Sequence, residues 1–305
     1  MRVTTVLDAI VPVALLISLG WVLRRREILG GRAFWDQLEH LTYVVLAPAL
    51  FVSSIARADL AVVDPVPMGG VLLGSTLLVT AALLGLRRNL SMDGPAFTSV
   101  VQGGVRLNTY VGLIVAGSLH GTPGIAIFAL ATAILVPAVN VICVAVLVRH
   151  GSQGIRLRTL PRQLATNPLI LGCMAGLGIN LGGLGVPPAL LDTAAILGHA
   201  ALATGMLCVG AALTWQSHPL AGRALAVSTT VKLVALPLVA AALCHLVGVT
   251  GAAATVVILI QGLPTAASAY VLARRMGGDA SLMSTITAGQ TAAALVTLPL
   301  ILQLA

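Results

Sequence analysis

Two short polar stretches, each in the middle of a long apolar run, hold the residues whose types could bind a ligand. The first reads QGGVRLNTY over residues 102–110, and the second reads QGLPT over residues 261–265. No acid pair, metal cluster or activated nucleophile accompanies them at the same depth, so the pattern favours binding over catalysis, and we expect no enzyme. The candidate contacts are Gln102, Arg106, Asn108, Tyr110, Gln261, Pro264 and Thr265.

Arg106 lies near the centre of its apolar run. A charge in the middle of a membrane span costs about 2.5–3.5 kcal/mol on insertion scales, so this side chain is expected to face a cavity or a partner. In one interpretation, the pair Gly103-Gly104 loosens the helix and Asn108 satisfies the freed backbone groups. Arg106 would then attract a carboxylate, which a guanidinium can bind through two parallel hydrogen bonds. In the other interpretation, Arg106 is structural and bonds the carbonyls of a neighbouring broken helix.

The second stretch predicts a kinked helix. Pro264 removes a helical hydrogen bond in the middle of its run, and Gly262 allows another backbone to approach closely. A kink in a membrane helix frees backbone groups that can bind a ligand. We therefore expect Pro264 and Thr265 to lie near the site.

Two further residues are candidates for charge or ion coupling. Lys232 lies inside an apolar run, where its ammonium would either reach toward the membrane surface or act near the site. His199 also lies in mid-run, where it could titrate near neutral pH or simply pack.

The acidic residues and cysteines are informative by their placement. All 9 acidic residues fall in loops or near the ends of apolar runs, so we expect no buried acidic pair that relays protons or sodium. The 4 cysteines occur singly and lack metal-ligand spacing. The sequence therefore predicts neither a metal site nor a cofactor.

The composition indicates that the polar stretches belong to segments that lie in a lipid bilayer. The chain has 305 residues, of which 58% are hydrophobic and 9% charged, whereas soluble domains carry about 25% charged residues. The apolar runs do not alternate with polar residues, which excludes a membrane β-barrel. We expect an all-α integral membrane protein with about ten helices, over residues 5–23, 36–56, 68–86, 95–119, 124–148, 167–184, 189–213, 223–247, 252–273 and 281–303.

The basic residues predict the orientation. The net charge of +8 comes from short clusters between apolar runs, which is a feature of membrane topology and not of a nucleic-acid groove. With both termini outside the cytoplasmic membrane, most of the basic residues fall in cytoplasmic loops: Arg24, Arg25, Arg26, Arg32, Arg87, Arg88, Arg149, Arg156, Arg158, Arg162, Arg223, Arg274 and Arg275.

The two halves of the chain resemble each other at a fixed offset. Asn108-Thr109 aligns with Pro264-Thr265, and Gly121 aligns with Gly277. We expect a first repeat over 1–149, a cytoplasmic connection over 150–166, and a second repeat over 167–305. Because each repeat holds five spans, the second is inserted upside down, a construction that many secondary transporters use.

Five stretches in order resemble a known family along essentially the whole chain. They are LAPALF (46–51), RLNT (106–109), NPLI (167–170), VKL (231–233) followed by Pro237, and LPTA (263–266). This set resembles the auxin efflux carrier family, which includes plant PIN carriers and bacterial malonate-transporter-like proteins. Members usually carry a proline shortly after the Asn-Thr of helix 4, whereas residues 111–115 here read VGLIV. The break of helix 4 must then depend on its glycines and Asn108.

The resemblance implies a fold similar to sodium/proton antiporters and bile-acid symporters. Helices 1, 2, 6 and 7 would form a scaffold, helices 3–5 and 8–10 would form a moving transport domain, and the broken helices 4 and 9 would cross at the substrate. It also implies elevator-type transport of a small organic anion, such as a mono- or dicarboxylate, with net efflux and a homodimer. The alternative is an organic-anion symporter coupled to sodium or protons.

Overall fold

The computed structural model describes residues 3–58, 64–152, 166–183, 185–213, 218–266 and 268–304. In these ranges the chain is helical throughout, with no β-strand, which confirms the predicted all-α membrane class. Most of the predicted connection over 150–166, including its three arginines, lies outside the described residues.

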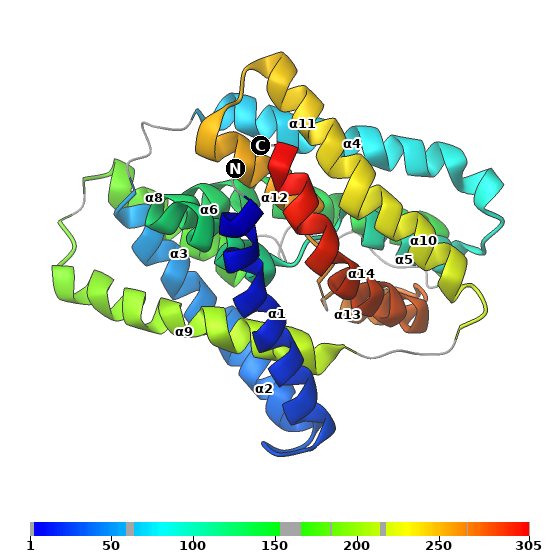
Figure 1. Cartoon of the computed structure of the whole chain (residues 1–305), viewed down its shortest axis with the longest axis horizontal. Helices are drawn as coiled ribbons and strands as arrows, with labels where there is room; N and C mark the ends of the chain where they lie inside the picture. The colour runs from blue at the N-terminus through cyan, green and yellow to red at the C-terminus, as the bar shows by residue number, and fades with distance from the viewer. Residues whose placement is uncertain are drawn as a thin grey trace.

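The helices follow one another closely along the chain (Figure 1). They are α1 (Val3–Arg25), α2 (Arg32–Leu41), the π-helical turn η1 (Thr42–Leu46), α3 (Ala47–Ala56), α4 (Pro65–Leu90), α5 (Gly94–Val105), α6 (Thr109–His150), α8 (Pro168–Leu181), α9 (Pro188–Ala212), α10 (Ala221–Thr230), the π-helical turn η4 (Val231–Ala235), α11 (Leu236–Val247), α12 (Gly251–Gly262), α13 (Ser268–Arg275), α14 (Ala280–Ile301) and the short 3-10 turn η5 (Leu302–Leu304). Each of the ten predicted ranges falls on helical structure.

Length and composition identify the helices that can cross a membrane. Within the described ranges, six continuous segments are long and apolar enough: Arg32–Ala56, Pro65–Leu90, Gly94–His150, Pro188–Ala212, Ala221–Val247 and Ala280–Ile301. The helices α8 and α12 are apolar but shorter. The segment Gly94–His150 is long enough for two crossings, since about 20 residues span the hydrocarbon core. Ten crossings stay a prediction.

Two glycines with positive φ reverse the chain at equivalent places in the two halves. Gly121 interrupts α6 with φ 63°, and Gly277 lies between α13 and α14 with φ 69°. Only glycine adopts this region without a steric penalty. These are the two glycines that the offset between the halves aligned.

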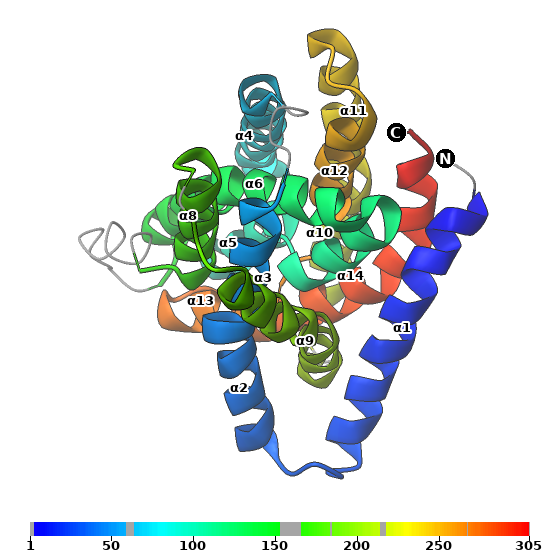
Figure 2. The ribbon, with the colours of Figure 1, turned by 90° about the vertical axis from the view of Figure 1, so that its left-hand side faces the viewer.

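The helices pack as two groups. In the first group, α1 packs along α9, while α3 packs against α8 and α9. In the second, α4, α10, α11, α12 and α14 pack around α5 and α6, and α6 also contacts α1 and α3. Figure 2 shows α1 and α2 diverging as a V from the short turn that joins them. The N- and C-termini lie close together in both views.

Glycines allow α1 and α9 to approach closely. A Cβ atom at Gly20 would collide with the carbonyl of Leu207, and one at Gly210 would collide with the carbonyl of Ile17. Small residues let membrane helices pack with backbones in contact, where van der Waals attraction is strongest. The first group is therefore tightly held together.

Predicted cytoplasmic loops meet at one end of the second group. The guanidinium of Arg223 donates to the carbonyl of Asn89 at 2.8 Å, joining the start of α10 to the end of α4. At the same end, His218 lies 2.9 Å from Asp279, and the backbone N–H of Ser152 donates to Gly277. The clustering of these loops agrees with a common side of the membrane for the basic residues.

Candidate functional site

Two interrupted helices cross at the centre of the molecule. Between α5 and α6, residues 106–108 are extended, with φ −72° and ψ 157° at Arg106 and φ −91° and ψ 101° at Asn108. Between α12 and α13, the chain leaves the helix at Leu263 with φ −68° and ψ 143°. The predicted break of helix 4 is therefore present without the family proline, and the predicted kink at Pro264 is a full interruption.

A backbone hydrogen bond joins the two breaks. The N–H of Asn108 donates to the carbonyl of Pro264 at 2.8 Å. The reciprocal bond cannot form, because proline has no N–H. The Asn108 side chain then starts α6: its Oδ1 accepts from the N–H groups of Tyr110 at 3.1 Å and Val111 at 3.4 Å. Asparagine is among the best residues for this capping role, so the break ends where the sequence provides a new helix start.

Gln290 of α14 connects both breaks, and the sequence prediction missed it. Its Oε1 accepts from the N–H of Thr265 at 3.0 Å, and its Nε2 donates to the carbonyl of Gly103 at 2.9 Å. The side chain is fully buried. One amide thus satisfies a backbone donor from one interruption and a backbone acceptor from the other. A glutamine in the middle of an apolar helix was the available signal.

A central cavity of about 160 Å³ lies at the crossing. It is bounded by both helix groups and by the two breaks. Its lining residues are Glu39, Tyr43, Arg106, Leu107, Asn108, Thr109, Tyr110, Val136, Val139, Asn140, Asn167, Leu169, Cys208, Val209, Ala266 and Ser268. Three of the predicted contacts, Arg106, Asn108 and Tyr110, are therefore brought together in one polar cavity.

Arg106 is half-buried in this cavity and lacks a charged partner. Its guanidinium donates to Oδ1 of Asn140 at 3.1 Å and to Oγ of Ser268 at 3.4 Å. Among the residues that the structure describes, no carboxylate forms an ion pair with it. Its contacts are neutral side chains and not the backbone carbonyls of the structural interpretation. The guanidinium therefore has no ion-pair partner at the crossing in the described ranges.

Three helices begin at the cavity wall. Asn108 caps α6, Asn167 caps α8 by accepting from the N–H groups of Leu169 and Ile170, and Ser268 is the first residue of α13. The N-terminus of a helix carries a partial positive charge and unpaired N–H groups, which favour anions. These helix ends favour a bound anion, as the positive charge of Arg106 does.

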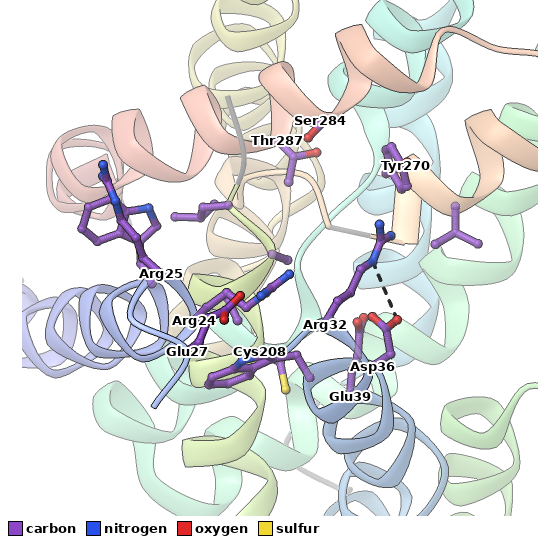
Figure 3. A pocket seen from close by; sticks show the side chains of 16 residues that line it. Arg24, Arg25, Glu27, Arg32, Asp36, Glu39, Cys208, Tyr270, Ser284 and Thr287 are labelled. Atoms are coloured by element: carbon purple, nitrogen blue, oxygen red, sulfur yellow. Dashed lines mark ion pairs between the residues drawn. The ribbon is translucent and has the colours of Figure 1, made fainter. Parts of the chain in front are cut away.

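A larger vestibule of about 660 Å³ adjoins the central cavity. It is lined by charged side chains from α1, α2 and the turn between them, including Arg24, Arg32 and Asp36, and by α9, α13 and α14 (Figure 3). Arg32 and Asp36 form an exposed ion pair at 3.8 Å. The vestibule and the central cavity share two lining residues, Glu39 and Cys208.

Comparison with known proteins finds similarity to membrane transport proteins. A family model described as "Membrane transport protein" matches residues 155–302, which include the second break. A protein of Methanothermobacter thermautotrophicus described as an uncharacterized transporter is 28% identical over 303 residues, and the match covers 96% of each chain. Residues 155–302 of the chain are therefore similar to this family of membrane transport proteins. Both matches agree with the resemblance to a transporter family that the motifs predicted.

Four predicted contacts do not line the central cavity. Gln261 is buried, and its Nε2 donates to Leu72 O, Ser75 Oγ and Thr76 Oγ1 at 2.8–3.0 Å. Gln102 and Thr265 are also buried, and Pro264 contributes its carbonyl to the crossing. In this conformation Gln261 bonds α4, Thr265 bonds Gln290 of α14 through its backbone N–H, and Pro264 bonds the first break. Direct contact with a substrate stays a prediction.

The two candidates for charge or coupling do not line the central cavity. Lys232 is fully buried in η4, with its Nζ 3.4 Å from the carbonyl of Ile260, so the prediction that it reaches toward the membrane surface is wrong. Its side chain lies among packed helices that bury it on all sides. His199 is exposed on α9 and bonds the carbonyl of Ala195 at 2.7 Å. The structure brings neither residue to Arg106.

Glu39 is a functional candidate that the sequence did not reveal. It lies near the start of its helical segment, as predicted for the acidic residues, yet it lines both cavities. The position of a residue along its helix does not show whether a cavity between helices reaches its side chain. In the described ranges, no group of three or more His, Cys, Asp or Glu side chains is placed to hold a metal ion.

Proposed function

We propose that the transporter moves a small organic anion, such as a mono- or dicarboxylate, through the central cavity at the crossing of its two interrupted helices. The observation that carries this proposal is Arg106: its guanidinium lines the cavity with only neutral partners. A buried cation without a counter-ion is unfavourable, and an anionic substrate would provide that counter-ion. The three helix N-termini at the cavity add favourable dipoles.

The size of the cavity favours a small substrate. A volume of about 160 Å³ corresponds to about five water molecules at ~30 Å³ each. A carboxylate with a few carbon atoms fits this space, together with the hydroxyl, amide and guanidinium groups that would orient it. Tyr110 contributes a buried hydroxyl that has no hydrogen-bond partner in the described part of the chain.

The packing of the helices supports two inverted repeats. Under the predicted repeat, the contact of α1 with α9 corresponds to the contact of α3 with α8. Both of these contacts are present. The equivalent glycines Gly121 and Gly277 both adopt positive φ, and the equivalent residues Asn108 and Pro264 meet at the crossing. The repeats would extend over residues 1–149 and 167–305.

The location of the cavities supports an elevator mechanism. In the proposed arrangement, α1, α2, α3, α8 and α9 form the scaffold, and α4, α5, α6 and α10–α14 form the moving domain. The central cavity is lined by both groups, and the vestibule lies beside the basic turn between α1 and α2. By the positive-inside rule this vestibule opens to the cytoplasm and both termini lie outside. Net efflux and a homodimer formed through the scaffold belong to the same proposal.

Replacing Arg106 tests this function. Charge-assisted hydrogen bonds are worth about 1.5–3 kcal/mol, so Arg106→Gln should weaken anion binding about ten- to hundredfold. A thermal-shift screen of detergent-purified protein with malonate, malate, lactate and indole-acetate selects the anion. Uptake of that anion into proteoliposomes then compares wild type with the variant.

Arg57→Gln is the matched control. Arg57 is paired with Asp192 at 2.6 Å on an exposed surface, outside both cavities. It should retain wild-type uptake, because exposed pairs contribute little to stability. Equal uptake by wild type and Arg106→Gln would remove Arg106 from the mechanism.

A further inference from the structure

Glu39 lies where the vestibule meets the central cavity. It is the only carboxylate that lines the central cavity within the described residues, and it is half-buried. Figure 3 shows it on α2 beside Asp36, with Cys208 of α9 nearby. An anion that enters the central cavity from the vestibule must therefore pass this carboxylate and remain close to it.

The charged and titratable groups that line the two cavities with Glu39 come from several elements. On the vestibule side they are Arg24 and Arg25 from α1, Glu27 from the turn after it, Arg32 and Asp36 from α2, and Tyr270 from α13. On the inner side they are Tyr43 from η1, Arg106 from the first break, Tyr110 from α6 and Cys208 from α9. None of the cations forms an ion pair with Glu39 in the described ranges. An ionised Glu39 is thus not neutralised by a fixed partner.

Occupancy of the cavity changes the charge balance at Glu39. In a space of about 160 Å³, a bound anion lies close to both Arg106 and Glu39. The attraction to Arg106 favours binding, while an ionised Glu39 would repel the same anion. Like charges at a shared site favour protonation of one of the two groups. Binding of the anion and binding of a proton are therefore coupled.

We propose that Glu39 takes up one proton when the organic anion binds, so that the transporter moves one proton together with each anion. This inference rests on the proposed function. The empty site contains Arg106 as a cation and Glu39 as a carboxylate; the occupied site contains the same cation, protonated Glu39 and the anion. For a monoanion, the added negative charge and the added proton cancel, so the loaded site has the net charge of the empty one. A dianion leaves the loaded site with one more negative charge than the empty site.

The coupling has a measurable signature in binding. Over the pH range in which Glu39 is ionised in the empty site and protonated in the occupied site, binding of the anion takes up one proton. Each unit of rising pH in that range therefore raises the dissociation constant of the anion about tenfold. Glu39→Gln resembles the protonated side chain. Its affinity should stay at the value that wild type reaches at low pH, without this dependence.

Dissociation constants measured in detergent between about pH 5 and about pH 9 provide the first test. Malonate, malate and lactate are the probes, and the ratio of wild-type to variant constants at each pH removes the titration of the probe itself. We expect this ratio to rise about tenfold per pH unit over part of the range for Glu39→Gln. Asp192→Asn, an acid-to-amide change at an exposed position outside both cavities, should give a constant ratio near one.

Proton movement provides a second test, made first on the wild-type protein. Wild-type proteoliposomes that contain a pH-sensitive dye should acidify when the selected anion is added outside, and Glu39→Asp should retain this response. Two results would overturn the role of Glu39 and leave the proposed function intact. In the first, wild type and Glu39→Gln bind the anion with the same pH dependence. In the second, the anion is taken up without acidification. If none of the anions binds wild type at any pH, the proposed function itself is refuted.

Discussion

Gln290 holds the two helix interruptions together, and Gln290→Met removes this connection with little change in side-chain length. The side chain is fully buried, and both of its hydrogen bonds go to backbone groups, the N–H of Thr265 and the carbonyl of Gly103. Methionine fills the space but can bond neither group well. We therefore expect Gln290→Met to lower the free energy of unfolding.

The two lost bonds set the magnitude. If each is worth ~0.6 kcal/mol, the average of double-mutant cycles in a membrane protein, the loss is about 1.2 kcal/mol. If each stranded backbone group instead pays the ~3 kcal/mol of a buried unsatisfied polar atom, the loss reaches about 6 kcal/mol. The lower limit assumes that the backbone finds new partners. The upper limit assumes that the crossing is rigid.

Reversible unfolding in mixed micelles measures the difference between wild type and Gln290→Met. Gln303→Met is the matched control, because Gln303 is exposed near the C-terminus and bonds only the carbonyl of Pro299 at 3.2 Å. This control should change the free energy of unfolding by no more than about 0.5 kcal/mol. If Gln290→Met is as stable as Gln303→Met, the connection between the breaks is not a source of stability.

Two further substitutions test the packing of the two helix groups. Gly210→Ala places a methyl group against the carbonyl of Ile17, so α1 and α9 must separate. The free energy of unfolding, measured by the same assay, should fall by about 1–3 kcal/mol. An unchanged free energy of unfolding would show that this contact is loose. Lys232→Met removes a fully buried amine that has one carbonyl partner, so the stability should stay equal or rise by about 1 kcal/mol, and a loss of more than 1 kcal/mol would indicate an essential charge there.

The positions of the helices could be predicted from the sequence because the apolar runs are long and the ends are marked. Asp93, Asn167 and Asp279 stand directly before α5, α8 and α14, and each caps its helix by accepting from backbone N–H groups. The breaks were also visible, as Gly-rich or Pro-containing stretches in mid-run. The hydrogen bond between Asn108 and Pro264 agrees with the alignment of the two halves.

The partners across the fold could not be predicted in the same way. Gln102 and Gln261 were chosen because they are polar and close in sequence to the breaks, yet neither lines the central cavity. Gln290 and Glu39 lie far along the chain from the first break. Only tertiary packing brings Gln290 to the carbonyl of Gly103 and Glu39 to the central cavity. Local pattern shows that a polar residue in a membrane helix needs a partner, but not which partner it finds.

An experimental structure with the bound anion tests the central claim most directly. The protein would be saturated with the anion that gives the largest thermal shift, and its position determined. We predict that the anion occupies the cavity at the crossing, with a carboxylate within hydrogen-bond distance of the Arg106 guanidinium. An anion held only by the vestibule arginines, with water alone beside Arg106, would contradict the account.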